Sequence, residues 1–174
     1  QSASSSFDNS WNRSQFKYGV EMHPGYVNMY FKKSRMGVFP KLMKYSREFK
    51  RILGIKRSLL PEKKRTEVSV CNYDETWQRI LKIRPKDGIN MIPCAFVDWD
   101  NTPRHGMRGC VYKNATPEKF KMYLSQLVDN AQKYYNTDMI FVFAWNEWAE
   151  GGYLEPDTKN GWGYLEAIKE VVEN

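Results

Sequence analysis

The chain has 174 residues, of which 41% are hydrophobic and 27% are charged. A length near ~150 residues fits a single domain, and this apolar content is too high for a disordered or fibrous protein. The longest uninterrupted apolar run, Met139 to Trp145, is far shorter than the ~20 residues that cross a bilayer, so no membrane-spanning helix is predicted. Because the sequence begins without a methionine or a signal-peptide pattern, we interpret it as a fragment or a trimmed chain.

The net charge of +7 is unevenly distributed along the chain. Residues 32–65 carry 13 Lys or Arg and only two acids. This basic segment 32–65 either contacts an anionic membrane or nucleic acid, or forms the solvated face of a helix. No base-reading motif accompanies it, so nucleic acid is not a predicted partner. The cysteine usage predicts a cytoplasmic protein, and attachment to the inner membrane through segment 32–65 is an alternative.

The three cysteines, Cys71, Cys94 and Cys110, have no C-x-x-C spacing and no histidine cluster beside them. Neither a disulfide framework nor a zinc site is predicted, which fits a reducing compartment. His23 and His105 lack the spacing of a metal-binding helix. We therefore expect no metal and no cofactor.

Hydrophobic periodicity and turn residues divide the chain into alternating strands and helices. Residues 1–15 are rich in Ser and Asn and are predicted to be a loop or a frayed end. The predicted strands span residues 17–22, 68–71, 89–97 and 139–145, the last two fully buried. The predicted helices span residues 40–53, 73–83, 117–135 and 163–172. This order favours an α/β fold with parallel strands.

Both predicted buried strands are followed by loops rich in aromatic and ionisable side chains. The first loop runs from Asp98 to Gly106 and the second from Trp145 to Asp157. In folds of this class the chemistry lies at the carboxyl ends of the strands. Carboxylates, amides and flat aromatic rings together suit the hydroxyl rim and the C–H faces of a sugar. A saccharide site is therefore predicted at these two loops.

Glu147 and Glu150 form the sharpest feature of the second loop. If the chain turns helically after Trp145, residues three apart come within ~5 to 6 Å of each other at their Cβ atoms. Retaining glycosidases hold two carboxyls about 5 to 5.5 Å apart, and at that separation two acids titrate unequally, so that one keeps a proton near neutrality. The pair is predicted to be catalytic, although the same spacing also occurs in acids that cap amides or form ion pairs.

The segment from Asn146 to Gly151 reads N-E-W-A-E-G, and Leu154-Glu155-Pro156-Asp157 follows it. Together with the earlier motif W-D-N-T-P-R at residues 99–104, it resembles the WbsX family of polysaccharide-biosynthesis proteins. That family is related to glycoside hydrolase family 99, the endo-α-mannosidases, whose active-site segment has the form E-W-x-E-G. The resemblance implies a (β/α)₈ barrel of TIM type, which needs ~250 residues. Residues 16–174 would then be the C-terminal portion of one incomplete barrel domain.

By the same resemblance, Glu150 matches the general acid and base, and Glu147 draws a proton from the sugar 2-hydroxyl so that this oxygen attacks the anomeric carbon. The implied mechanism passes through a 1,2-anhydro sugar and needs no metal. Ala149 stands where the hydrolases commonly carry His, so the resemblance does not carry their substrate over to this chain. Family members are described as glycosyltransferases of O-antigen or capsule loci, so glycosyl transfer and retaining hydrolysis are both implied, on an oligosaccharide or polysaccharide substrate.

The remaining site residues are predicted to bind substrate. They are Glu21, Trp99, Asp100, Asn101, Arg104, Asn146, Trp148 and Glu155.

Alternatives remain open for several of these residues. Arg104 and Asp100 could form a structural ion pair. Trp145, at the end of a buried strand, is predicted to belong to the core. Asp98 and Asp100 also fit a D-x-D metal motif, although two acids at this spacing are common by chance. The whole chain could finally be a polysaccharide-binding domain without catalysis.

Overall fold

A computed structural model describes residues 3–5, 17–28, 67–85 and 90–173. The predicted helix at 40–53, the basic segment 32–65 and most of the predicted loop at 1–15 lie outside the described residues. None of the helices in the described ranges is long and apolar enough to cross a membrane.

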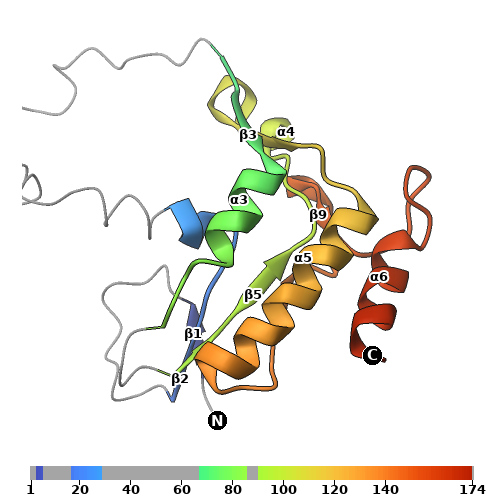
Figure 1. The fold of residues 1–174 in the computed structure, drawn as a ribbon. Coiled ribbons are helices and arrows are strands. Elements are labelled where there is room, and N and C mark those ends of the chain that lie inside the picture. Colours follow the sequence, from blue (N-terminus) through green and yellow to red (C-terminus); the bar gives the residue numbers. More distant parts are fainter. Residues whose placement is uncertain (1–2, 6–16, 29–66, 86–89, 174) are drawn as a thin grey trace, which may run out of the picture.

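The described elements alternate between short strands and helices along the chain (Figure 1). The strands are β1 (Ala3–Ser5), β2 (Tyr18–Val20), β3 (Ser69–Asn72), β4 (Met91–Ile92), β5 (Cys94–Phe96), β6 (Cys110–Lys113), β7 (Phe141–Phe143), β8 (Asn146–Glu147) and β9 (Gly152–Tyr153). The helices are α3 (Tyr73–Ile80), α4 (Thr102–His105), α5 (Pro117–Asn130) and α6 (Gly163–Val172). Shorter turns lie at Gly106–Arg108, Ala131–Tyr135 and Trp148–Glu150.

Most described strand pairs are parallel. β2 pairs with β1 and with β4, β3 pairs with β6, and β5 pairs with β7. Only β8 and β9, a local hairpin, are antiparallel among the described strands. Within the segment predicted to be a loop or a frayed end, the backbone of β1 pairs in parallel with β2. Closure of these strands into a (β/α)₈ barrel stays a prediction.

Pro93 divides the predicted strand at 89–97 into β4 and β5. Proline has no N–H to donate to a ladder, so regular pairing stops there. Its carbonyl still accepts from the Phe141 amide at 3.0 Å. Before this point the chain pairs with β2, and after it with β7, so the 91–96 stretch links two groups of parallel strands.

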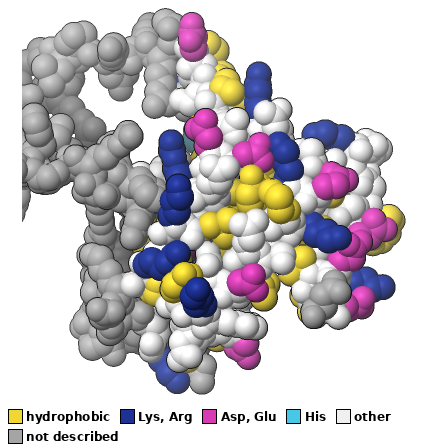
Figure 2. Space-filling view, viewed as in Figure 1, with side chains coloured by type: hydrophobic (Ala, Val, Ile, Leu, Met, Phe, Trp, Pro, Cys, Tyr) yellow, Lys and Arg dark blue, Asp and Glu magenta, His cyan; other side chains and the backbone are white. Residues whose placement is uncertain are grey.

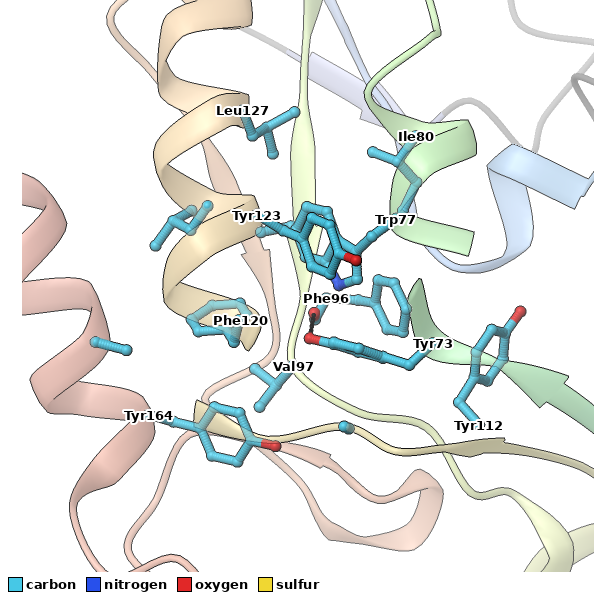
Figure 3. Close-up of a cluster of buried hydrophobic side chains, with 14 of the residues drawn as sticks. Tyr73, Trp77, Ile80, Phe96, Val97, Tyr112, Phe120, Tyr123, Leu127 and Tyr164 are labelled. Atoms are coloured by element: carbon cyan, nitrogen blue, oxygen red, sulfur yellow. Dashed lines mark hydrogen bonds between the residues drawn. The ribbon is translucent and has the colours of Figure 1, made fainter. Parts of the chain in front are cut away.

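The hydrophobic core lies where α3, α5 and α6 meet the strands. In Figure 3 the Trp77 ring lies between the rings of Phe96 and Tyr123, and it stacks on both with centroids 5.5 Å apart. Tyr73 donates its hydroxyl to the Phe96 carbonyl at 3.4 Å. On the next helix pair, Phe120 meets Tyr164 edge to face at 5.6 Å. Aromatic contacts thus join three helices to β5.

Two predicted helix starts are confirmed by their caps. The Asn72 side chain accepts from the Glu75 amide at 3.1 Å at the start of α3. The Thr116 hydroxyl accepts from the Lys119 amide at 3.3 Å at the start of α5, where Pro117 follows. Such caps satisfy backbone N–H groups that the first helical turn leaves without partners.

The predicted full burial of residues 139–145 is wrong. Phe141 and Trp145 are 46% and 55% exposed, whereas Val142 between them packs against the core. Side chains alternate between the two faces of a strand, and within the described residues the helices cover the face to which Val142 belongs. Trp145 is therefore not a core residue.

Opposite charges are interspersed on the outer surface of the described helices (Figure 2). Lys119 binds Asp74 at 2.6 Å, Arg79 lies 3.9 Å from Glu75, and Lys121 pairs with Glu170. The first pair joins α5 to α3, and Tyr123 also donates to Asp74 at 2.9 Å. Lys119, followed by Tyr123, lowers the pKa of the Asp74 carboxyl against the opposing effect of burial.

Candidate functional site

The two loops predicted to form the site follow the adjacent parallel strands β5 and β7. The carboxyl ends of these strands meet at the same edge, because the pair runs parallel with Phe96 opposite Phe143. The Asp100 amide in the first loop donates to the Glu150 carbonyl in the second at 2.7 Å. The Ala144 amide donates to the Gly152 carbonyl at 3.2 Å. The structure thus brings the two sequence motifs together.

Glu147 and Glu150 lie at opposite ends of one tight turn. Glu147 is the last residue of β8, and the 3₁₀ turn Trp148–Glu150 follows it. The helical turn therefore begins after Glu147, two residues later in the chain than the predicted turn after Trp145. β9 then returns antiparallel, with Gly152 opposite Glu147. Both residues are partly buried, and their catalytic role stays a prediction.

Gly151 lets the second loop close against the first. Its φ of +65° is in the left-handed region, and a Cβ at this position would lie 3.0 Å from the Asp100 nitrogen. A side chain would therefore be strained and would also press on the backbone whose hydrogen bond joins the loops. The glycine after Glu150 is thus needed for the junction.

Arg104 pairs with Glu150, which corrects the alternative of an Arg104–Asp100 ion pair. The Arg104 Nη1 atom donates to Glu150 Oε1 at 2.9 Å. The Arg104 side chain is 53% exposed and that of Glu150 is 15% exposed. Asp100 is occupied elsewhere, since its Oδ1 atom accepts from the Thr102 amide at 2.9 Å and from the Thr102 hydroxyl at 2.6 Å. The ion pair ties α4 to the carboxylate of the second loop.

The first loop is held by its own predicted site residues. Asn101 Oδ1 accepts from the Cys110 amide at 2.7 Å, and the Asn101 amide donates to the Cys110 carbonyl at 3.2 Å. The Trp99 carbonyl accepts from the Tyr112 amide at 2.8 Å, while the Trp99 ring lies 5.6 Å from that of Phe143. These contacts fix the loop geometry, and substrate contact by Trp99, Asp100 and Asn101 stays a prediction.

Trp148 belongs to a small aromatic and carboxylate assembly. Its ring stacks on Tyr153 with centroids 3.7 Å apart, and its indole N–H donates to Glu155 Oε2 at 2.6 Å. Tyr153 donates to Asp157 Oδ2 at 2.9 Å, and burial followed by Asp157 raises the pKa of Tyr153 to about 12. Trp148 remains 49% exposed, so one aromatic surface is held in a fixed orientation and is open to solvent.

Sequence reasoning missed the roles of Tyr153 and Asp157 in this assembly. Asp157 accepts from the Lys159 amide and from Asn160 within its own turn. A carboxylate followed closely by Asn-Gly was the available signal for that turn. Asn146 is exposed on β8, opposite Tyr153, so the structure places it at the same hairpin as Trp148.

The Asp98 side chain forms a hydrogen bond within its own loop. Its Oδ1 atom accepts from the Trp99 amide at 2.7 Å, and burial raises the pKa of the carboxyl. Among the described residues, no group of three or more His, Cys, Asp or Glu side chains is placed to hold a metal ion.

The described contacts of Glu21 lie outside the two strand-end loops. It is fully buried, and the Tyr135 hydroxyl lies 3.1 and 3.2 Å from its two carboxylate oxygens. His23 Nε2 is 3.4 Å from Glu21 Oε2. Burial and the Glu21 charge raise the pKa of Tyr135 well above its ordinary value. The described contacts link Glu21 to His23, Ile92 and Tyr135, and its contact with substrate stays a prediction.

The described parallel strands β5 and β7 carry ionisable and aromatic loops at their carboxyl ends, and this edge is the candidate site. The chain belongs to the Glycosyltransferase WbsX family, whose sequence model matches residues 4–168.

Two relatives, both named uncharacterized protein WxcX, come from Xanthomonas campestris pv. campestris strains B100 and ATCC 33913. Each is 35% identical to the chain over 98 residues, which is 54% of this chain and 14% of the relative. The chain therefore spans only a small part of the length of these relatives. No solved structure matches the chain.

Proposed function

We propose that the chain contributes to a glycosyltransferase of polysaccharide biosynthesis, with its reaction centre at the two strand-end loops. The family supports transfer of a glycosyl unit and a carbohydrate substrate. The junction of the loops supports this location of the reaction centre. There the Asp100 amide binds the Glu150 carbonyl, and Arg104 binds the Glu150 carboxylate. We further propose that the parallel strands belong to a (β/α)₈ barrel, in which strand-end loops form the active site.

Glu147 and Glu150 are the reacting carboxyls in this proposal. They flank a single turn that begins at Trp148, whose half-exposed ring is fixed by a hydrogen bond from its indole to Glu155. An aromatic ring of this kind offers a sugar a flat apolar surface, and the carboxylates accept from hydroxyl groups. The related hydrolase mechanism, with a 1,2-anhydro sugar, is one version of the chemistry; transfer to a sugar hydroxyl is the version that the family name favours.

Glu147→Gln is the direct test of this function. Turnover by the full-length protein on mannose-containing and O-antigen oligosaccharides should fall by about a hundredfold or more, because general acid or base catalysis is lost. Affinity for the same oligosaccharides should persist, since the amide has nearly the shape of the carboxyl. The anomeric configuration of the product separates retention from inversion.

Glu166→Gln is the matched control. Glu166 is exposed on α6, and its substitution makes the same change of charge outside the candidate site. Equal turnover in wild type and Glu147→Gln would contradict the proposal.

A polysaccharide-binding domain without catalysis is the second candidate. The stacked and hydrogen-bonded Trp148 favours it, because a binding platform needs no reacting carboxyl. Glycan binding that depends on Trp148, without turnover in the wild-type protein, would establish this reading in place of the first.

A further inference from the structure

Cys71 and Cys110 are two cysteines that the fold brings into contact. Their Sγ atoms lie 3.3 Å apart, although the residues are 39 positions apart in the chain. Both are thiols in the structure, and both are partly buried. Their spacing in the sequence does not predict a pair, because the contact depends on how the strands align.

The parallel ladder between β3 and β6 holds the two thiols together. In this ladder Cys71 is opposite Tyr112, two residues after Cys110, so the cysteines are diagonal neighbours. Residues two apart on a strand share a face, and both cysteines pack against the hydrophobic core. Val70 belongs to the opposite face of β3 and is 58% exposed. The thiols thus meet on the inner face of the ladder.

This contact is close to the geometry of a disulfide. The bond needs a sulfur–sulfur distance of about 2.05 Å, so from 3.3 Å each sulfur atom has to move by about 0.6 Å if the two share the shift. Both cysteines are also partly exposed, which lets a small thiol reagent reach them. The pair therefore combines proximity with access.

Cys94 differs from this pair in both respects. It is 1% exposed, and its Sγ atom donates to the Ala95 carbonyl at 3.2 Å. Burial raises the pKa of the Cys94 thiol to about 12. Because the thiolate is the reactive form of cysteine, Cys94 is expected to stay reduced and serves as an internal reference.

Cys110 is in addition the anchor of the first loop. Its amide donates to Asn101 Oδ1 at 2.7 Å, and its carbonyl accepts from the Asn101 amide at 3.2 Å. The preceding carbonyl, of Gly109, accepts from the Ser69 amide of β3 at 3.1 Å. A covalent bond between β3 and Cys110 would therefore restrain the backbone that holds the first loop.

We propose that Cys71 and Cys110 are a redox-sensitive pair, which low-molecular-weight disulfides such as oxidised glutathione convert to an intramolecular disulfide that restrains the first loop. One cysteine thiolate attacks a sulfur atom of the reagent, forms a mixed disulfide and releases one glutathione thiolate. The other cysteine thiolate attacks the protein sulfur of the mixed disulfide and releases the second. The cysteines lose two electrons, which reduce the reagent, and their two protons pass to the released thiolates.

Incubation of the folded full chain in glutathione buffers of increasing oxidised fraction tests this pair without turnover or sugar. After alkylation of the remaining thiols, mass spectrometry should identify a peptide cross-linked between Cys71 and Cys110. Cys94 should be recovered as an alkylated thiol once the protein is unfolded. Excess reduced glutathione should restore both thiols, because a partly exposed disulfide is open to attack. Cys110→Ser should instead leave glutathione bound to Cys71.

The matched control combines Cys71→Ser with Val70→Cys. It keeps one thiol on β3 and moves it to the exposed face, away from Cys110. In an unfolded chain, thiols at positions 70 and 71 would reach Cys110 equally, so only the fold distinguishes the two proteins. The equilibrium constant for the intramolecular disulfide should be about tenfold or more lower in the control, because the native contact gives the wild-type thiols a high effective concentration.

Hydrogen exchange over residues 99–111 tests the restraint on the first loop. Exchange there should be about twofold or more slower in the oxidised protein than in the reduced one, because local opening is suppressed. Absence of the cross-link at every glutathione ratio, or equal cross-linking in the control, would overturn the pair. Unchanged exchange in the oxidised protein would overturn its link to the first loop.

Discussion

Gly151 and Gly161 share a backbone conformation and differ in their surroundings. Their φ values are +65° and +55°, both in the region that favours glycine. A Cβ at Gly151 would meet the Asp100 backbone at 3.0 Å, whereas a Cβ at Gly161 would meet no heavy atom within 4 Å. Alanine substitutions at the two glycines therefore separate the cost of the backbone conformation from the cost of displacing the loop junction.

Gly161→Ala should lower the free energy of unfolding by about 1 to 2 kcal/mol, the cost of a left-handed conformation for an ordinary residue. Gly151→Ala should lower it further, because it also pushes the two loops apart. Urea unfolding of both variants measures the difference. Equal losses would mean that the Asp100–Glu150 junction moves without resistance.

At the scale of the element, α3 is joined to the rest of the core by Trp77. The ring is fully buried and stacks on Phe96 of β5 on one face and on Tyr123 of α5 on the other. Its indole nitrogen has no hydrogen-bond partner in the described structure. Its contribution therefore comes from packing and from exclusion of water.

Trp77→Ala should lower the free energy of unfolding by about 3 to 5 kcal/mol, because it leaves a cavity between two rings. Met122→Ala on α5 is the control: Met122 is exposed, and its loss should cost about 0.5 kcal/mol or less. Chemical unfolding followed by circular dichroism compares the two. A small loss for Trp77→Ala would show that Phe96 and Tyr123 close the gap.

Helices with local signals were the elements that the sequence predicted best. Residues 163–172 and the start at Pro117 coincide with α6 and α5, because periodicity and capping residues are local properties. β6 and the β8–β9 hairpin were missed, since each is short and depends on a partner strand for its existence. The exposure of Phe141 could not be predicted either, because burial depends on what covers each face of the sheet.

At the scale of the whole molecule, the meeting of the two loops was predictable and their contacts were not. Parallel order alone places the ends of β5 and β7 at one edge. The pairing of Arg104 with Glu150 joins residues 46 positions apart, and it depends on the loop conformations that Asp100 and Gly151 set. Charge patterns near Arg104 suggested Asp100 as its partner, but that carboxylate binds Thr102.

The stability of the folded state depends on pH in two opposite ways, because folding lowers the pKa of some carboxyls and raises that of another. Lys119 holds the pKa of Asp74 below its ordinary value. For Asp157, burial alone would raise the pKa, but bonds from Asn160, Tyr153 and Lys159 outweigh it and lower the pKa. For Asp98, burial raises the pKa.

Asp74 and Asp157 therefore stabilise the fold above the unfolded-state pKa, and this stabilisation is lost as the pH falls through their lowered folded values. Asp98 has the opposite effect, because the cost of burying its ionised carboxylate grows as the pH rises above the unfolded-state pKa.

The variants Asp74→Asn and Asp98→Asn should consequently shift the pH dependence in opposite directions. Asp74→Asn should lose more stability at pH 7 than at about pH 3, where the wild-type carboxyl is already partly protonated. Asp98→Asn should gain stability at pH 7 relative to acid, because its amide still accepts from Trp99 and carries no charge to bury. Urea unfolding of both variants at the two pH values measures these slopes. A shift of the same sign in both would mean that the Asp98 carboxylate is stabilised by its loop more than burial destabilises it.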